Sequence, residues 1–464
     1  MRGRGKKSKR EKARGPCAPC RSRRAPPGTA LLLAFSLLLS PLRPSAAGPF
    51  NAVSALARDG SVVSTGTREG RLAVFDDAWQ TIRDRYYDPT FNGLDWQAER
   101  AALRPLAAEA DSPAELYAVL RRMVNALRDA HTRVYAPDEK FDWQHPRFIS
   151  VGVSLREVGG QAVVFAVEPG SAAERAGMRA GDLLLSIDGE PAGTVFARRL
   201  QEQTGASTRA AARLQAMSRL FEGPRDSTVR VVWAGADERE RTTTLRREWR
   251  EREPTLRVRR IRHDYGLAEF DVFTQAVAVE FMRALERRLG GVRGLVIDLR
   301  NNGGGEAEAM TEIASAFLPY GRSLGRFTDR AGRIRFEPQT RAVMLLAPDA
   351  IKSFRAPLVI LTSERTSSAA EIFAAALKEA GLATIIGQNT CGCVLAIRRR
   401  HILPDGGELD VSEMDYRTAG GMRLEGAGVV PDEKITLDRQ DLRARRDRAL
   451  ERAIERLKAE SGGR

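Results

Sequence analysis

The chain has 464 residues, and its 75 basic and 60 acidic side chains give a formal net charge of +15. Eleven of the basic residues lie in residues 1–24, so residues 48–464 carry a net charge of only +4, which excludes a strong electrostatic footprint for nucleic acid. A hydrophobic content of 42% excludes a disordered chain, and only four cysteines exclude a disulfide scaffold. The length predicts about two to four domains, at roughly 100–200 residues each.

Residues 1–47 follow the basic, apolar, small order of a secretory signal peptide. The apolar run at 29–40 is shorter than the roughly 20 residues that span a bilayer. Ser45 and Ala47 provide the small residues of a cleavage site before Gly48. We therefore expect an extracytoplasmic protein, periplasmic or secreted. An uncleaved membrane anchor with the protein facing outward is the alternative, because the basic stretch is long.

Cys17 and Cys20 have the spacing of half a metal site, but they lie in this targeting segment. They would be removed with a cleaved signal peptide. We interpret them as incidental cysteines.

Residues 48–148 are predicted to form an N-terminal helical region. Val74, Ala78 and Ile82 fall on one face of a helix. The sequence Ser-Pro-Ala-Glu at 112–115 is a capping box with proline at the first helical position, which indicates that a further helix begins there.

Residues 149–250 are predicted to form a small β domain. Two strand-like runs, at 149–155 and 162–167, precede a short helix that ends at a glycine. The run Ala-Gly-Asp-Leu-Leu-Leu-Ser-Ile-Asp-Gly at 180–189 predicts a strand and a turn. Residues 195–222 are more helical than a compact β domain needs, which indicates an inserted helix.

Residues 251–437 alternate predicted strands and helices, which favours an α/β fold around a largely parallel sheet. Apolar runs at 294–299 and 357–362 predict buried strands, and a helix is expected at 368–380. Residues 438–464 predict a solvated amphipathic helix, whose charged face needs no functional explanation.

The stretch Asp298–Gly305 follows a predicted buried strand and ends in three glycines. Glycines let the backbone approach a ligand and point its N–H groups at an anion, although a simple glycine-rich turn has the same pattern. No Lys-Ser or Lys-Thr pair follows, so nucleotide binding is disfavoured.

Ser368 begins a predicted helix, and Glu371 stands three residues later. As a capping box, the pair would stabilise the helix by about 1 kcal/mol. As a nucleophile, Ser368 would lie in the positive field of a helix N-terminus, beside a backbone N–H for an oxyanion. The local sequence is compatible with both interpretations.

His131 is one of four histidines, the others being His145, His263 and His401. A single histidine is more often structural than catalytic. A serine nucleophile needs a base, however, and histidine is the usual base near neutral pH.

Together these pieces resemble the C-terminal processing, or tail-specific, serine proteases. The run at 180–189 resembles a PDZ domain, and it is followed in the family's order and spacing by Asp298–Gly305, by Ser-Ala-Ala-Glu-Ile at 368–372 and by Gly-Ala-Gly-Val-Val-Pro-Asp at 426–432. The match extends from about Arg71 to Asp432.

This resemblance implies an α+β multidomain fold: the N-terminal helical region, the PDZ-like domain with its helical insertion, and an α/β protease core of the ClpP/crotonase-like type. It also implies a serine endopeptidase that hydrolyses peptide bonds in unfolded or C-terminally tagged proteins. No cofactor and no metal ion are expected.

One position departs from the family pattern. Serine–lysine members have Thr-Phe-Gly-Lys-Gly where this chain has Thr-Cys-Gly-Cys-Val at 390–394, so Cys393 takes the lysine position. A thiol cannot replace the amine as a base, and a non-catalytic peptide-binding protein that keeps the fold is therefore an alternative. Another treats Cys391 and Cys393 as a redox or metal pair, but two ligands do not make a zinc site, and two core cysteines are the favoured interpretation.

The chain is also similar to the tricorn-type branch of the family, whose histidine and glutamate positions match His131 and Glu425. The resemblance implies a triad in which Ser368 is the nucleophile, His131 is the base and Glu425 orients the imidazole. It also implies that backbone N–H groups of three residues meet the oxyanion: Gly304, Gly303 and Ala369.

The PDZ-like domain predicts how substrates are held. Such domains usually bind a C-terminal carboxylate by strand addition, here at the backbone of Val151, Gly152 and Val153. The expected partners are polypeptides with flexible C-termini. Nucleic acid is not expected, and a membrane is expected only if the N-terminal segment stays uncleaved.

Overall fold

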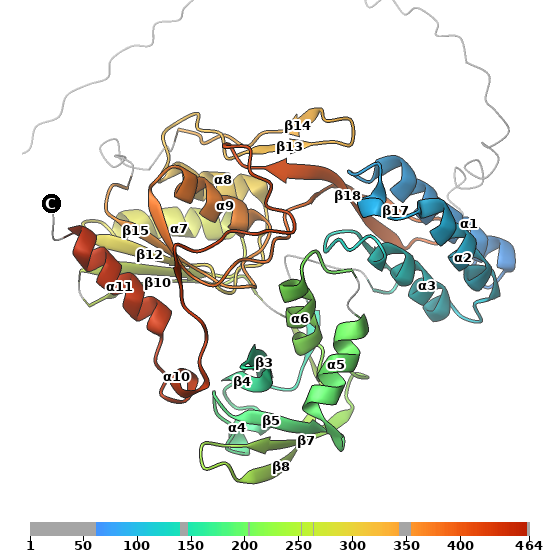
Figure 1. The fold of residues 1–464 in the computed structure, drawn as a ribbon, viewed down its shortest axis with the longest axis horizontal. Helices are drawn as coiled ribbons and strands as arrows, with labels where there is room; N and C mark the ends of the chain where they lie inside the picture. The colour runs from blue at the N-terminus through green and yellow to red at the C-terminus, as the bar shows by residue number, and fades with distance from the viewer. Residues whose placement is uncertain are drawn as a thin grey trace, which may run out of the picture. The chain divides into compact units, whose positions relative to one another are not determined.

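The computed structural model describes residues 62–139, 147–202, 205–251, 253–262, 264–342 and 354–461 (Figure 1). The expected targeting segment, with Cys17 and Cys20, lies outside the described residues, as do His145 and His263. Within the described ranges, no helix is both long and apolar enough to cross a bilayer.

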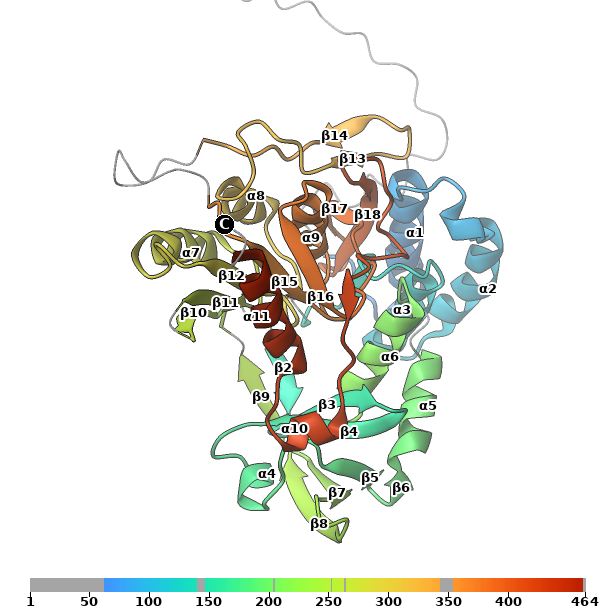
Figure 2. The same ribbon diagram turned by 60° about the vertical axis from the view of Figure 1, so that its left-hand side comes forward.

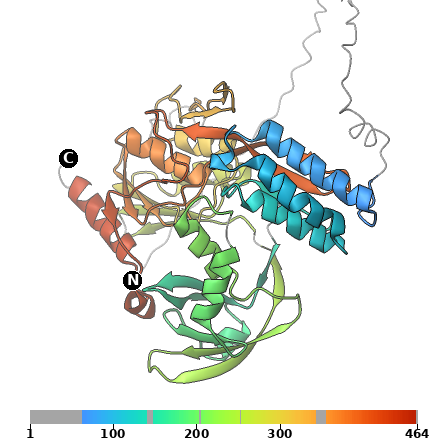
Figure 3. The ribbon, with the colours of Figure 1, turned by 45° about the vertical axis from the view of Figure 1, so that its right-hand side comes forward.

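Three helices form the N-terminal region: α1 (Arg68–Arg85), α2 (Trp96–Glu109) and α3 (Pro113–Asn125), with a short 3-10 turn, η2, at Phe91–Gly93. Each begins at a side-chain cap, and Ser112 caps α3 as the sequence predicts, by accepting a hydrogen bond from the Glu115 N–H. Their apolar faces pack into one core with later parts of the chain, which contribute Val134, Leu395, Leu403, Leu409 and Val411 (Figure 3).

A five-stranded sheet continues from these helices into the rest of the molecule. Its path is β1-β18-β13-β14, and β17 also pairs with β18. The strands are β1 (Arg133–Tyr135), β13 (Arg326–Thr328), β14 (Ile334–Phe336), β17 (Ala396–Ile402) and β18 (Glu408–Arg417). β1 is antiparallel to β18, with Arg133 opposite Asp410. This pairing holds the turn before β1, which carries His131.

The PDZ-like region is built on a six-stranded sheet in the order β3-β4-β5-β7-β8, with β6 beside β5. Its strands are β3 (Val153–Val158), β4 (Gln161–Val167), β5 (Leu183–Ile187), β6 (Glu190–Pro191), β7 (Thr228–Ala234) and β8 (Glu240–Arg246). Its helices are α4 (Ala172–Arg175), α5 (Ala192–Glu202) and α6 (Arg209–Ser218). β2 (Arg147–Ser150) and β9 (Glu248–Glu251) form a separate pair.

Two details of this region differ from the sequence prediction. The single strand expected at 149–155 is broken between β2 and β3, because Gly152 has φ +78° and packs against Ser171, whose Cβ a side chain at 152 would meet at 2.5 Å. The expected inserted helix is two helices, α5 and α6.

The core sheet has the order β10-β11-β12-β15-β16-β19 and is parallel from β11 onward. Its strands are β10 (Leu256–Ile261), β11 (Tyr265–Phe270), β12 (Gly294–Asp298), β15 (Leu358–Thr362), β16 (Ala383–Gly387) and β19 (Glu433–Lys434). Its helices are α7 (Gln275–Arg287), α8 (Ala307–Ser315), α9 (Ala369–Glu379), α10 (Arg439–Arg443) and α11 (Arg448–Ser461).

The central strands are buried on both faces, as their unbroken apolar runs predict. In β12, Leu295 and Ile297 join the core formed with α7, α8 and α9, whereas Val296 joins the core formed with α11. Figure 2 shows α11 lying along the sheet, and its fully buried Ala453 and Leu457 provide the contact. The two helical layers fix the C-terminal ends of β12 and β15, from which the active-site loops leave.

Candidate active site

Ser368 lies at the junction between β15 and α9, in a backbone conformation that serine rarely adopts. Its φ is 55° and its ψ is −125°. Such a conformation costs on the order of 1–3 kcal/mol and is found where surrounding contacts impose it, often at functional sites. Here the Ser368 N–H donates to the Cys393 carbonyl at 2.9 Å and to Glu371 Oε2 at 3.1 Å. A serine on a strained strand-to-helix turn is the arrangement of a nucleophile elbow.

Glu371 is the anchor of this turn. Its carboxylate is fully buried and accepts hydrogen bonds from the N–H of Gly392 at 2.7 Å, from the N–H of Cys393 at 2.9 Å and from the Thr390 hydroxyl. Burial raises the pKa of Glu371 to about 7. The carboxylate that the sequence identifies as half of a capping box thus ties the serine backbone to the loop at 390–393.

The glycine loop lies directly against Ser368. Gly304 has φ +97°, and a Cβ on it would lie 2.6 Å from Ser368 Cβ and 3.1 Å from the Ala369 N atom. The Gly304 N–H donates to Asn302 Oδ1 at 2.9 Å, and the Gly303 N–H donates to the Asp271 carbonyl at 3.1 Å. Both predicted oxyanion donors therefore have acceptors already.

Ala369 differs from these two glycines. It is the first residue of α9, where a backbone N–H has no acceptor inside the helix. Among the described residues, no acceptor is found for the Ala369 N–H. It is thus the free donor beside Ser368.

His131 lies in the turn between α3 and β1. The buried Asp129 shapes this turn by accepting hydrogen bonds from the His131 N–H at 2.8 Å and from the Thr132 hydroxyl. Burial lowers the pKa of His131 to about 4, so its imidazole is neutral near pH 7. Its Nδ1 atom is buried and has no hydrogen-bond partner among the described residues. A neutral imidazole is the form that can act as a base.

Glu425 lies in the turn that follows β18. Its Oε2 atom accepts hydrogen bonds from the N–H groups of Val394, at 2.7 Å, and Leu395, at 3.2 Å. Burial raises the pKa of Glu425 to about 7. The carboxylate therefore lies behind the loop that carries Cys391 and Cys393.

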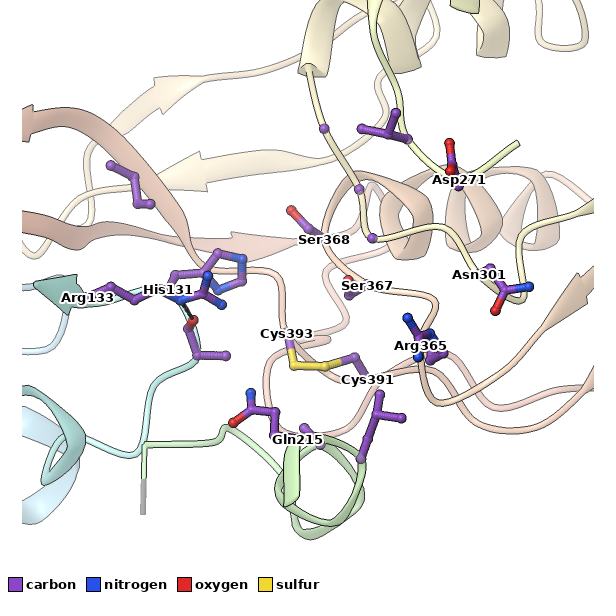
Figure 4. Close-up of a pocket in the computed structure, with 18 of the residues that line it drawn as sticks. His131, Arg133, Gln215, Asp271, Asn301, Arg365, Ser367, Ser368, Cys391 and Cys393 are labelled. Atoms are coloured by element: carbon purple, nitrogen blue, oxygen red, sulfur yellow. Dashed lines mark hydrogen bonds between the residues drawn. A yellow bond between two sulfur atoms is a disulfide. The ribbon is translucent and has the colours of Figure 1, made fainter. Parts of the chain in front are cut away.

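Ser368 and His131 line one cavity of about 870 Å³, and Figure 4 shows them on two sides of it. Helix α6 of the PDZ-like region contributes Leu214 and Gln215 to the same cavity. Within the described part of the chain, no hydrogen bond joins His131 to Ser368 or to Glu425. Catalytic hydrogen bonds are often long without substrate and tighten when it binds.

Cys391 and Cys393 form a disulfide. Both are buried, as expected of core cysteines, but the favoured interpretation as two independent core residues is wrong because their sulfur atoms are bonded. The side chain at the family's lysine position is thus neither an amine nor a free thiol.

The peptide-binding residues predicted in the PDZ-like region surround the break between β2 and β3. Val151 and Gly152 lie in the break and Val153 begins β3, the edge strand of its sheet. The Gly152 N–H donates to Ser150 Oγ at 2.9 Å. A carboxylate bound there would have to replace this hydroxyl.

Sequence reasoning missed Asp129 and the wider role of Glu371. The role of Asp129 could have been predicted from the sequence. An aspartate side chain often accepts a hydrogen bond from the backbone N–H two residues later, which here belongs to His131. The bonds from Glu371 to residues 390–393 had no local signal, because those residues are about 20 positions away.

Three family models match the chain in order. The Tricorn protease C1 domain matches residues 68–125, a PDZ domain matches 163–210, and Peptidase family S41 matches 265–435. The match to the tricorn domain falls within the predicted helical region. The PDZ match falls within the β region where the sequence resembles that domain.

Known proteins match over most of their length. The chloroplastic C-terminal processing peptidase of Tetradesmus obliquus is 30% identical over 388 residues, which cover 78% of this chain and 76% of that protein. The carboxyl-terminal-processing protease of Picosynechococcus sp. is 28% identical over 389 residues, covering 81% and 87%.

Two solved structures have a similar fold. The photosystem II D1 C-terminal processing protease is 28% identical, with a TM-score of 0.51, and the match covers 80% of this chain and 94% of that one. Mature CPAF complexed with lactacystin has a TM-score of 0.63 over 84% and 98% of the two chains, and at 13% identity it supports the fold alone.

These matches confirm the predicted α+β fold with N-terminal helices, a PDZ domain and a protease core. They also confirm the predicted enzyme class, because the relatives are named as processing proteases. The chain belongs to the C-terminal processing peptidases of peptidase family S41.

Proposed function

We propose that this peptidase cleaves unfolded or C-terminally tagged proteins outside the cytoplasm, with Ser368 as nucleophile, His131 as base and Glu425 as the residue that orients the imidazole. The observation that carries the proposal is that a strained serine and a neutral histidine line the same cavity. The family's usual lysine cannot supply the base, because Cys393 occupies that position in a disulfide.

In the proposed reaction, His131 takes the proton of the Ser368 hydroxyl as the serine oxygen attacks the peptide carbonyl. The imidazolium then returns this proton to the leaving amine, and water releases the acyl group by the same sequence. The unpartnered Nδ1 of His131 is the atom that an orienting carboxylate would bind. Both backbone N–H donors of Glu425 bind its Oε2 atom, so Oε1 is the oxygen that would accept the imidazole hydrogen bond.

The oxyanion is expected to meet the Ala369 N–H first, because that group has no other acceptor in the described structure. The Gly304 N–H would join it after leaving the Asn302 side chain. Each such donor typically contributes about 100- to 1,000-fold in rate.

Substrates are expected to be polypeptides held through flexible C-termini. The edge strand β3 would take the substrate as an added strand, and the turn at Gly152 would meet its carboxylate. Binding should be weak, because a disordered tail must become ordered. The PDZ domain would then raise the effective concentration of peptide at Ser368.

A fluorophosphonate probe tests the proposal directly, because it labels only an activated serine. The wild type should be labelled at Ser368, whereas Ser368→Ala should not be. His131→Ala should react about 10³- to 10⁶-fold more slowly, since loss of the base removes most triad catalysis. The melting temperatures should be nearly unchanged, which excludes unfolding as the cause.

Wild-type protein that stays unlabelled, and that binds denatured protein without cleaving it, would instead indicate a peptide-binding protein that keeps the fold. Labelling of His131→Ala at the wild-type rate would mean that the base is another group.

A further inference from the structure

The Cys391–Cys393 disulfide forms part of the wall of the catalytic cavity. Both cysteines line this cavity together with Ser368 and His131. Figure 4 shows the disulfide between the loop that carries Ser368 and helix α6, which carries Gln215. A small solute in the cavity would therefore lie against the two cysteines, which are 8% and 3% exposed.

On one side, the disulfide loop holds the nucleophile. The Cys393 carbonyl accepts the hydrogen bond from the Ser368 N–H, at 2.9 Å. The N–H groups of Gly392 and Cys393 bind the same Glu371 carboxylate that receives the Ser368 N–H. The conformation of this loop thus helps to impose the strained backbone of Ser368.

The loop also approaches the other two proposed triad residues. The next residue after Cys393, Val394, donates its N–H to Glu425 at 2.7 Å. Ala130, which precedes His131, packs with the two cysteines in a small apolar cluster. One short loop therefore contacts the surroundings of all three groups.

On its far side, the loop contacts the PDZ-like region. Thr208, the cap of α6, donates its hydroxyl hydrogen bond to the Cys391 carbonyl at 2.9 Å, and Ala211 packs with the cysteines. Ser207 Oγ accepts the N–H of Ala130 at 3.1 Å. A change in the conformation of the loop would therefore alter its contacts with α6, the helix on this side of the cavity.

We propose that Cys391 and Cys393 form a thiol–disulfide exchange site, and that reduction of their bond by a dithiol lowers the reactivity of Ser368. One thiolate of the dithiol attacks a cysteine sulfur to form a mixed disulfide, and the other cysteine leaves as a thiolate. The second thiol of the reductant then displaces the remaining cysteine. Two electrons and two protons pass from the dithiol to the cysteine pair, which becomes two thiols, while the reductant becomes a disulfide.

Reduction removes the only covalent link that closes the loop at 391–393. The carbonyl that accepts from the Ser368 N–H, and the N–H groups that donate to Glu371, then lie in a loop held by hydrogen bonds without the disulfide. A displacement of about 1 Å near a catalytic group can cost about 100-fold in rate. The reduced enzyme is therefore expected to react about 10- to 100-fold more slowly with a fluorophosphonate.

The experiment compares the full-length protein before and after treatment with dithiothreitol. Alkylation and mass analysis verify the state of both sulfur atoms. Fluorophosphonate labelling reports the reactivity of Ser368. Amide hydrogen exchange in residues 366–372 reports how strongly the backbone around Ser368 is protected from local opening. Reduction should slow labelling and accelerate exchange, and reoxidation should reverse both effects.

Matched variants locate the effect. The double variant Cys391→Ser, Cys393→Ser should have the labelling rate and the amide exchange of the reduced enzyme. Dithiothreitol should change neither value. The double variant Cys17→Ser, Cys20→Ser removes the chain's other two cysteines and should keep the full response. Because the wild-type comparison needs no substitution, it decides the question even if the first variant fails to fold.

The inference rests on Ser368 being the nucleophile, and the two readouts separate the two ideas. If Ser368 is unlabelled in both redox states while amide hydrogen exchange still responds to reduction, the proposed nucleophile is wrong. The proposal of a thiol–disulfide exchange site is then still supported. Unchanged exchange after verified reduction overturns the exchange site, and so does protein purified under oxidising conditions whose Cys391 and Cys393 alkylate without a reductant.

Discussion

At the scale of single residues, two buried carboxylates and one imidazole give the active site an unusual charge pattern. Burial moves the pKa of His131 down to about 4 and the pKa of Glu425 up to about 7. The proposed base is therefore neutral near pH 7, whereas the proposed orienting carboxylate is half ionised there. His131 also faces Asp129, Arg133 and Asp410. In this site the carboxylate, and not the histidine, is expected to control the pH dependence.

The activity should rise with pH and level off above about pH 7. A carboxylate can stabilise an imidazolium only in its charged form, and Glu425 gains that charge as the pH passes its raised pKa. Glu425→Gln should lower kcat/KM by about 10⁴-fold, the effect of the comparable change in a serine triad. The test is the pH profile of kcat/KM for both proteins with a denatured substrate.

The neighbouring Glu371 has its pKa in the same range, and its charge acts on Glu425. The two groups therefore titrate as a coupled pair. A rising limb that persists unchanged in Glu425→Gln would assign the titration to Glu371 and contradict the role of Glu425.

At the scale of elements, the site depends on how closely a glycine loop approaches the start of α9. Gly304→Ala places a methyl group 2.6 Å from Ser368 Cβ, at a φ of +97° that a side chain disfavours. We expect about a 100- to 1,000-fold loss of kcat, similar to the loss of one oxyanion donor, and a lower melting temperature. Gly303→Ala is the matched control, because a Cβ there meets no atom within 4 Å. Equal rates for the two variants would show that the close approach is unimportant.

The elements also show which features could be predicted from sequence. Helix α3 begins where the capping box at Ser112 predicts it, and the buried runs at 294–299 and 357–362 become β12 and β15. These predictions succeed because caps and apolar runs act locally. The break at Gly152 was missed, because only its tertiary contact with Ser171 explains it.

The proposed nucleophile and base could be named only by resemblance. Ser368 and His131 are distant in sequence, and the turn that carries His131 is held by the long-range pairing of β1 with β18. No local pattern encodes such a pairing. The disulfide was missed for a related reason, since a spacing of two residues is equally compatible with two unbonded core cysteines.

At the scale of the whole molecule, the proposed function has a tailed substrate bind the PDZ domain and the catalytic cavity together. If the carboxylate of the tail is captured near Gly152, amidation of the substrate's C-terminus should raise KM about 10-fold or more and leave kcat nearly unchanged. Steady-state kinetics with a matched pair of acid and amide peptides measures this. For a short peptide that does not reach the PDZ domain, amidation should leave KM unchanged. Equal KM values for the two tailed peptides would contradict carboxylate capture.

The expected export of the protein is tested at its N-terminus. Sequencing of the mature protein should give a start near Gly48, because the small residues Ser45 and Ala47 precede it. A membrane-bound form that begins at Met1 would indicate the anchor. Recovery from the cytoplasm would contradict both forms of export.

The pairing of β1 with β18 has a consequence for biosynthesis. Thr132, next to the proposed base, accepts a hydrogen bond from Ser412, which lies 280 positions later in the chain. At about 5–20 residues per second, a ribosome needs tens of seconds to add that length. Throughout this interval β1 has no β18 to pair with, and for most of it Ser368 has not yet been added. If the proposed triad is right, the active site is complete only after β18 and Glu425 have been added, so proteolytic activity is expected only late in synthesis.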